Sequence, residues 1–366
     1  MLFFSEFKQC VHALNPRQRH IILCNIVLLN IILILIVCAF ALRIQKSKLQ
    51  QAQFIQSKTV QQHIPIQDLA KINDLAVVEA KVYIVGIKDI NLKDSVIPVN
   101  FILSTTYKKK DFPQDSPQIE LANGTIISKY LYYKSVDEGI VHEVVSYEAN
   151  IEPIYQLQLY PLDKQVISIR PMAKNWLNEK FNIKISDMYL DSGSLIPNSD
   201  YVLEKSGFAN SIDTFSIMIG HKNKEVSSVG NTIYTVFNHK NVYTYIKHIQ
   251  YIVLAILIAL FSLLINAKTA SPKNGRVAVI GSSVFSLAAN VFQINSTIRA
   301  TNVFTLVDFI TIFAGLIILM SYVTTVKTLK LIDTESYETS KAFDLSVFYC
   351  LLAYIIIFFT SIYIYA

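Results

Sequence analysis

The stretch LYPLDKQ at residues 159–165 joins two runs that have the composition of β-strands, IYQLQLY before it and VISI after it. It places two large apolar residues, Tyr160 and Leu162, on either side of Pro161. A turn exposed to water is usually built from Gly, Asn, Asp or Ser. The apolar turn therefore predicts that the tip of this loop meets an apolar surface.

The composition of the 366-residue chain indicates where such a surface comes from. The chain is 52% hydrophobic and only 16% charged, whereas soluble domains carry about 25% charged residues. Several apolar runs account for the excess, and each is close to the roughly 20 residues that cross a bilayer as a helix. They are His20–Leu42, Ile249–Ile265, Val277–Ile294, Val303–Val326 and Leu345–Tyr365. Together they predict a membrane protein.

The first run is interpreted as an uncleaved anchor with residues 1–19 in the cytoplasm. Its apolar core is longer than that of a signal peptide, and no small-x-small cleavage site precedes Arg43. Basic residues in the later loops, at 267–276 and 327–344, favour the same orientation, although the basic residues that directly follow the first run oppose it. We expect a bacterial inner (plasma) membrane protein whose middle region lies in the periplasm or the extracellular space.

The exported region divides into a spacer and a β-rich domain. Residues 43–73 are polar and rich in Gln, which suits a juxtamembrane helix or spacer. Residues 74–245 hold many short strand patterns between polar turns, which is typical of an antiparallel β-sandwich. The predicted fold is therefore a membrane protein of β + α class: an N-terminal transmembrane anchor at 20–42, the exported sandwich, and a C-terminal four-helix transmembrane bundle at 246–366.

The sequence offers no pattern for catalysis or for a bound metal or cofactor. The four Cys residues lie in or beside the apolar runs, so no disulfide is expected in the exported domain. None of the seven His residues has metal-ligand spacing, and no phosphate-binding loop or activated nucleophile is present. The net charge of +6 is attributed to membrane orientation and scattered Lys. We expect neither an enzyme nor a nucleic-acid-binding protein.

From about residue 74 to 366 the chain resembles the pentameric ligand-gated ion channels (the Cys-loop receptor superfamily) in their prokaryotic, cysteine-free form. VYIVGIKDINLKDSVIPVNFILSTTYKKKD resembles the first two strands of that family, and SPQIELANGT resembles its Trp-x-Pro-x-Ile-x-x-x-Asn segment. LYPLDKQ resembles its Phe-Pro-Phe-Asp-x-Gln signature, and TVFNHKNVYTYI resembles the strand that enters the membrane. The N-terminal anchor is not part of the usual plan of the family.

The resemblance implies a homopentamer in which the LYPLDKQ loop couples the sandwich to the pore. Its tip would contact the segment 295–302. The alternative left open is that Tyr160 and Leu162 cap the core of the sandwich. The implied coupling residues are Tyr160, Pro161, Leu162, Asp163, Arg299 and Asp308, with Arg299 as the expected partner of Asp308. The implied ligand-binding residues are Tyr107, Asn123 and Trp176, for a small ligand that is not identified.

The pore is expected in the third apolar run, because five copies of one helix around an axis each show the lumen a narrow stripe. Two neighbouring stripes compete. One is Val277, Gly281, Val284, Ala288 and Val291; the preferred one, by resemblance to the family register, is Ala278, Ser282, Phe285, Ala289 and Phe292. Lys273 and Arg276 would form a basic cytoplasmic mouth that favours anions.

Two other interpretations are open. In one, the chain keeps the channel fold without conducting ions and acts as an envelope sensor or adaptor. In the other, it is a non-pentameric subunit whose tethered sandwich binds an envelope protein. In each case the expected surroundings are membrane lipid and protein partners.

Overall fold

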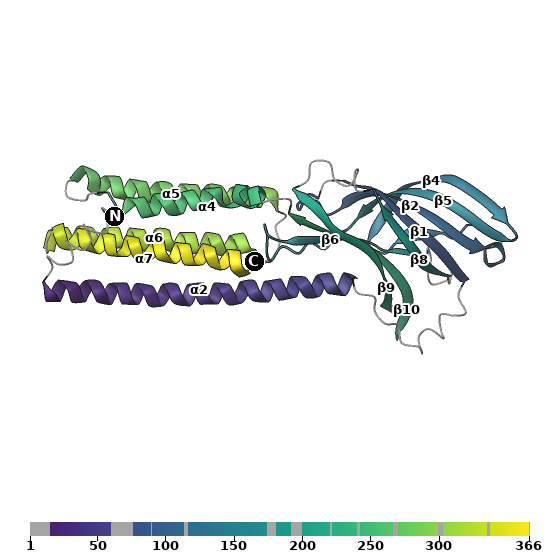
Figure 1. Cartoon of the computed structure of the whole chain (residues 1–366), viewed down its shortest axis with the longest axis horizontal. Helices are drawn as coiled ribbons and strands as arrows, with labels where there is room; N and C mark the ends of the chain where they lie inside the picture. Colours follow the sequence, from purple (N-terminus) through teal and green to yellow (C-terminus); the bar gives the residue numbers. More distant parts are fainter. Residues whose placement is uncertain are drawn as a thin grey trace. The chain divides into compact units, whose positions relative to one another are not determined.

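The computed structural model describes residues 15–59, 76–88, 90–112, 116–173, 181–191, 200–219, 222–239, 242–265, 270–298, 303–334 and 337–365. These residues form two compact units. One unit contains the helices up to Gln50 and from Val242 onward together with the segment Leu157–Leu162, and the other contains the strands (Figure 1). The chain is thus a mixed α/β protein with a β unit and a helical unit.

The helical unit contains long apolar helices. They are α2 (Pro16–Thr59), which belongs to this unit up to Gln50, α4 (Val242–Ser262), α5 (Ala270–Thr297), α6 (Leu306–Thr334) and α7 (Tyr337–Tyr365). Among the described helices, α2, α5, α6 and α7 are long and apolar enough to cross a membrane, whereas the apolar part of α4, Ile249–Ser262, is shorter. Their length and composition indicate a membrane protein, as the apolar runs predicted.

Helix α2 extends well beyond the predicted anchor at residues 20–42. It runs without interruption to Thr59, so much of the predicted spacer is helical. Gln, Lys and Leu are good helix formers, and no Gly or Pro occurs between Pro16 and Pro65. Pro16 itself suits the first helical position, where a backbone N–H would have no partner within the helix.

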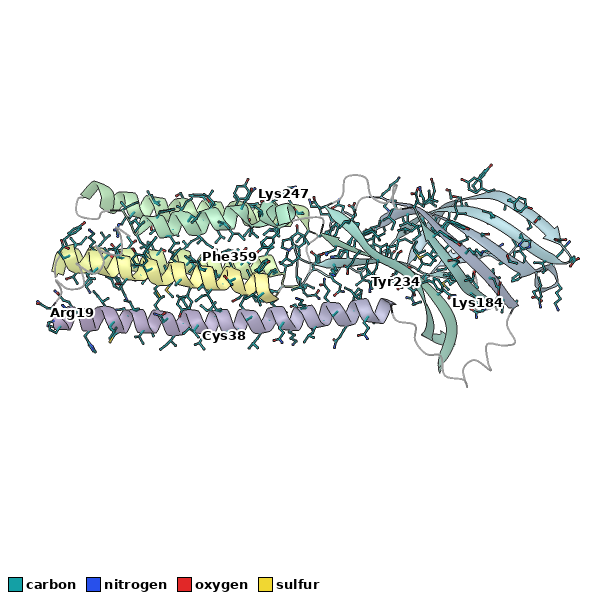
Figure 2. All side chains as sticks on the ribbon, in the orientation of Figure 1. Arg19, Cys38, Lys184, Tyr234, Lys247 and Phe359 are labelled. Carbon is teal, nitrogen blue, oxygen red and sulfur yellow. The ribbon has the colours of Figure 1, made fainter. Side chains whose placement is uncertain are left out.

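One stripe of α2 packs against the rest of the helical unit. The stripe has helical spacing and contains Ile22, Leu29, Leu33, Phe40 and Ile44, all buried. The ring of Phe40 lies 4.4 Å from that of Phe358 on α7 and 5.8 Å from that of Phe309 on α6. The Tyr354 hydroxyl donates to the Asn30 carbonyl at 3.3 Å. Helix α2 therefore lies along α6 and α7, with Cys38 among its exposed residues (Figure 2).

Small residues let α4, α5 and α6 pack closely. Ala255 and Ala259 of α4 form a buried cluster with Ile280 of α5 and Ile318 of α6. Leu287 of α5 packs against this cluster. Because the two alanines carry only a methyl group, the neighbouring helices can approach closely at this point. This packing fixes which face of α5 is turned inward.

The β unit is built around a five-stranded sheet with the order β4-β5-β2-β1-β8. Its strands are β1 (Ala76–Ile87), β2 (Ile97–Lys108), β4 (Gly124–Asp137), β5 (Ile140–Ile151) and β8 (Phe181–Leu190). All neighbours pair antiparallel except β1 and β8, which are parallel. The prediction of a purely antiparallel fold is wrong at this pair, because strands so distant in sequence are not constrained by a hairpin to run in opposite directions.

Alternation of buried and exposed residues makes these segments strands. In β1 the buried residues Val78, Ala80, Val82 and Ile84 alternate with exposed ones, the two-residue period of a sheet with one buried face. The β4–β5 hairpin turns at Glu138 and Gly139, whose φ angles of 47° and 79° are both positive. Positive φ at both central residues is what a two-residue type I′ hairpin requires.

The remaining strands form two smaller sheets. A three-stranded sheet has the order β6-β10-β9, from β6 (Lys164–Ile169), β9 (Tyr201–Ile219) and β10 (Lys222–His239). A pair joins β3 (Ile119–Leu121) to β7 (Pro171–Ala173). Gly207 of β9 faces Tyr234 of β10 (Figure 2), and a Cβ at Gly207 would lie 2.7 Å from the Tyr234 hydroxyl oxygen. A larger residue at this position would displace the end of the tyrosine side chain.

Candidate pore helix, its ion pair and the proline loop

Helix α5 turns one stripe of residues toward its neighbours in the helical unit. The stripe contains Arg276, Ile280, Ser283, Asn290 and Ile294, all buried, with Leu287 packed in the same line. Successive members are three, four or seven residues apart, which keeps them on one face of a helix. Half of these side chains are polar, so this face does more than fill an apolar core.

The predicted pore stripe lies on roughly the opposite side of α5, at about 100° of rotation per residue. Its members Ala278, Ser282, Phe285, Ala289 and Phe292 are all exposed in the single chain. Phe285 and Phe292 are 80% and 76% exposed, which makes them the most exposed large side chains of the helix. In the competing stripe, Gly281 is half-buried, and Val284 and Val291 are 52% and 40% exposed.

At its N-terminal end, α5 is fastened by a buried ion pair. The Arg276 Nη1 atom lies 2.8 Å from Asp344 Oδ2 on α7, and the two side chains are 3% and 5% exposed. Arg276 also donates to the carbonyl of Ile265 (2.6 Å from Nε) and to that of Leu263 (3.3 Å from Nη2), just after α4 ends. The Thr328 hydroxyl of α6 donates to Asp344 Oδ1 at 2.5 Å. One ion pair therefore ties four helices together.

This geometry corrects the expected role of Arg276. The sequence placed Arg276 with Lys273 at an open cytoplasmic mouth, where its charge would act on ions. Its guanidinium is instead buried and neutralised by Asp344 within a single chain. Assembly of several chains can only increase that burial, so Arg276 does not supply a free charge at a mouth. Lys273 lies near the start of α5.

Sequence reasoning missed Asp344, although a signal for it was present. Asp344 precedes the apolar run that begins at Leu345, so it looked like part of a polar loop. In α7 it lies on the same face as Val347, Leu351, Tyr354, Phe358 and Ile362, all of which are buried. Extending the helical spacing of that buried face by one turn would have placed Asp344 inside.

Asp308 has a local partner at the start of α6. Its Oδ2 atom accepts hydrogen bonds from the backbone N–H and the hydroxyl of Thr305, both at 2.8 Å. The Thr305 hydroxyl in turn accepts from the backbone N–H of Asp308 at 3.2 Å. This reciprocal pattern is a capping box. Arg299, the expected partner, lies outside the described residues.

The LYPLDKQ loop is split between the two units. Leu157–Leu162 belongs to the helical unit, whereas Gln156 and the residues from Asp163 onward belong to the β unit. Tyr160 and Pro161 are buried, Leu162 is half-buried, and the Tyr160–Pro161 peptide bond is cis. Two backbone hydrogen bonds, Tyr160 to Leu157 and Leu162 to Leu159, fold the tip on itself.

Asp163 and Gln165 close the base of this loop. The side-chain amide of Gln165 accepts from the Gln156 N–H at 3.1 Å and donates to the Gln156 carbonyl at 3.2 Å, as a backbone partner in a sheet would. Asp163 is fully buried and accepts from the Gln165 amide and from the Tyr201 hydroxyl of β9. The acid and the glutamine of the motif therefore hold the loop, and Asp163 faces β9.

Two of the three expected ligand-binding residues, Tyr107 and Asn123, are described by the structure, and each has partners of its own. Tyr107 is 4% exposed, its ring packs edge-on against Phe112 at 5.2 Å, and its hydroxyl donates to Glu143 Oε2 at 2.8 Å. Burial and the nearby Glu143 raise the pKa of Tyr107 to about 12. Asn123 bonds the backbone of β6, donating to the Ser168 carbonyl at 2.7 Å. Trp176 lies outside the described residues.

A cavity of about 610 Å³ lies in the β unit, and Glu143, which accepts from Tyr107, is part of its lining. Its walls are β3, β4 and β5, and they include Ile119, Lys129, Glu143 and Tyr147. Burial, with a smaller effect of Glu143, raises the pKa of Tyr147 to about 12. Volumes of this size admit small organic molecules. The lining residues of this cavity do not include Tyr107 or Asn123, so the ligand site stays a prediction.

Among the described residues, no group of three or more His, Cys, Asp and Glu side chains is placed to hold a metal ion. A comparison of the chain with models of known protein families finds no match, and a comparison with curated proteins finds none either. The arrangement of the residues within each unit is therefore what carries the functional proposal.

Proposed function

We propose that the chain is one subunit of a homopentameric ion channel of the ligand-gated type, with α5 lining the pore. In this proposal the sheets of the β unit form an extracytoplasmic sandwich, and the chain lies in a bacterial inner membrane with its N-terminus in the cytoplasm. The observation that carries the proposal is the exposed stripe of α5, which lies opposite the face that packs against α4, α6 and α7.

The composition of α5 favours water over lipid as the surroundings of its exposed stripe. Among the helices long enough to span a membrane, α5 has the least apolar sequence, although it is also as exposed as most of the others. Its exposed stripe has the small residues Ala278, Ser282 and Ala289, whereas lipid-facing surfaces are usually lined by large aliphatic side chains. A helix of this kind is best placed where several copies surround a water-filled axis.

Phe285 and Phe292 supply the closing element of the proposed pore. They are two turns apart on the exposed stripe, and both project freely from the single chain. Rings of such side chains around an axis exclude water, and apolar constrictions gate by dewetting. In this proposal, the rings of Phe285 and Phe292 close the pore.

The proposal keeps the expected preference for anions, although fewer basic residues now support it. The sequence between Ala267 and Val307 contains no Asp or Glu, so no acidic ring is available to favour cations. With Arg276 paired to Asp344, Lys273 is the remaining basic candidate for the cytoplasmic mouth. Basic rings favour anions.

Coupling is assigned to the tip of the LYPLDKQ loop. The membership of Leu157–Leu162 in the helical unit supports this role, as does the way Gln165 and Asp163 hold the base of the loop within the β unit. In this proposal, a change in the β unit is passed on through the base of the loop to its tip.

A non-conducting adaptor is the second candidate, and α2 is the observation that favours it. The helix lies along α6 and α7 through the Phe40 contacts, and its exposed side carries Leu23, Leu28, Ile31 and Leu35. Such a face in a membrane contacts either lipid or another membrane protein. An adaptor would use this face for binding and would carry no current.

Cysteine accessibility combined with flux distinguishes the candidates. In a chain whose four native cysteines are replaced by serine, Ser282→Cys should react with a charged, membrane-impermeant thiol reagent and block anion flux into liposomes. Ile356→Cys, on an exposed face of α7, is the lipid-facing control and should not react. Reaction at Val284→Cys in place of Ser282→Cys would shift the register of the pore. Absence of flux from well-folded protein under all stimuli would favour the adaptor.

A further inference from the structure

The five-stranded sheet ends in an unusually apolar edge strand. Strand β4 pairs with β5 on one side, and no other described strand pairs with its second side. Large side chains along it are 50% to 65% exposed. We call this surface the β4 edge patch; it consists of Ile127, Tyr130, Leu131, Tyr132, Tyr133 and Val136.

The β4 edge patch covers both faces of the strand. Tyr130 and Tyr132 share one face, where their rings meet edge-to-face with centroids 5.0 Å apart. Leu131 lies on the other face, where it lines the cavity with Lys129. An unpaired apolar edge promotes aggregation unless it is covered. A surface that covers this one has to wrap around the edge.

The area of the patch suits a subunit contact. Aromatic side chains bury about 150–250 Å² each, so three tyrosines that are 56–65% exposed offer roughly 300–450 Å². One partner in a stable interface contributes about 800 Å². The tyrosines alone thus supply about half of one partner's share, and tyrosine is among the residue types enriched in such interfaces.

The opposite end of the same sheet carries a different apolar surface. We call it the β1–β8 patch; it consists of Val77, Tyr83, Val85 and Tyr189, each 38–45% exposed. The rings of Tyr83 and Tyr189 stack 4.8 Å apart with an angle of 12° between them, which makes a flat aromatic platform. Beside it, Lys184 (Figure 2) and Glu79 form an ion pair at 4.0 Å, and the Tyr189 hydroxyl donates to Asp187 Oδ2 at 2.5 Å.

Unlike patches at the two ends of one sheet suit head-to-tail association. A contact between different surfaces of identical subunits leaves one free surface of each kind, and it ends only when a ring closes. A two-fold dimer would bury both patches only if they lay on one surface of the subunit, whereas they lie at opposite ends of the sheet. A second copy of this chain therefore satisfies both patches without any other protein.

We propose that the β4 edge patch of one copy docks on the β1–β8 patch of the next copy around a ring. This proposal rests on the proposed function in one respect, that the chain assembles into a closed homo-oligomer. It adds the pair of surfaces through which the β units join.

Disulfide cross-linking tests the pairing directly. In the full-length chain without its native cysteines, Tyr132→Cys and Tyr189→Cys are introduced together and separately. The double variant should form a ladder of cross-linked oligomers on oxidation, and each single variant should remain monomeric in denaturing gels. Ile154→Cys, 60% exposed outside both patches, replaces Tyr132→Cys in the control pair and should give no ladder.

The mass of the oligomer, measured over a range of protein concentrations, tests how much the β4 edge patch stabilises assembly. Tyr130→Ser combined with Tyr132→Ser should raise the concentration at which the oligomer dissociates by about tenfold or more, as expected when interface tyrosines are lost. Ile154→Ser should leave it unchanged, and circular dichroism should confirm that both variants are folded.

The two proposals fail in different ways. A wild-type oligomer that shows no ladder in the double variant, or a cross-linked dimer from Tyr132→Cys alone, would overturn the patch pairing and leave the channel proposal standing. A ladder that closes at a number other than five would support the patch pairing and overturn the pentamer.

Discussion

Replacing Asp344 by asparagine removes the negative charge from a buried pair without removing its shape. The amide oxygen of the new side chain would still accept from Thr328, but the Arg276 guanidinium would keep only the carbonyls of Leu263 and Ile265 as partners. Breaking a buried ion pair from one side costs about 3–5 kcal/mol. We expect the lower end, about 3 kcal/mol, because two carbonyls continue to stabilise the cation.

Thermal unfolding of the purified protein measures this loss. For a unit of roughly this size, each kcal/mol lowers Tm by about 2–4 °C, so Asp344→Asn should lower it by about 6–12 °C. Lys327→Gln is the matched control, because Lys327 makes an exposed hydrogen bond to Asn25 at 2.7 Å. An exposed hydrogen bond contributes about 1 kcal/mol or less, so the control should shift Tm only slightly.

The double substitution Arg276→Met with Asp344→Leu removes both charges of the ion pair and fills its place with apolar side chains. Apolar residues of similar volume often replace a buried ion pair without loss of stability, so most of the lost Tm should return. A shift for Asp344→Asn no larger than that of Lys327→Gln would refute the argument. A double-mutant cycle with Arg276→Gln in which the two losses of stability add within about 0.5 kcal/mol would also refute it.

Other predictions concern the capping box, the buried tyrosine and the proposed gate. Thr305→Ala removes both hydrogen bonds of the Thr305 hydroxyl with Asp308 and should cost about 0.5–2 kcal/mol of stability, measured as a lower Tm. Tyr107, whose pKa is raised to about 12 by burial beside Glu143, is neutral when folded; its contribution is complete below pH 10 and is lost as the pH rises toward 12. The Tm should therefore fall as the pH rises across that range, and it should fall less in Tyr107→Phe. Phe285→Ala should increase resting ion flux into liposomes, because it removes the more exposed aromatic ring of the stripe; unchanged flux would place the gate elsewhere.

Much of the secondary structure was predictable because its signals are local. Apolar runs long enough for a bilayer became α2, α5, α6 and α7, and alternation in AVVEAKVYIV became β1. Ends of elements were less predictable: α2 continues past the predicted anchor to Thr59, because nothing in the polar segment breaks a helix.

The candidate site was predictable in part. Helical spacing and the family register identified the stripe from Ala278 to Phe292, and the structure leaves all its members exposed in one chain. The pore itself stays a prediction, since it depends on contacts between copies. Arg276 was recognised as a notable residue but given the wrong surroundings, because the sequence does not say which helix packs over it.

Taken alone, the sequence determined the type of most main segments, since long apolar runs and the two-residue period of a sheet are written in consecutive residues. The run IYQLQLY, predicted as a strand, is not one in the structure. Only the tertiary structure decided which distant residues meet. Asp344 pairs with Arg276, which is 68 positions away in the sequence, and β1 pairs in parallel with β8. The side-chain amide of Gln165 hydrogen-bonds the backbone N–H and carbonyl of Gln156. Each of these partners is chosen by the packing of whole elements. A charge or an amide buried by that packing must be satisfied by the groups that happen to lie within hydrogen-bond reach.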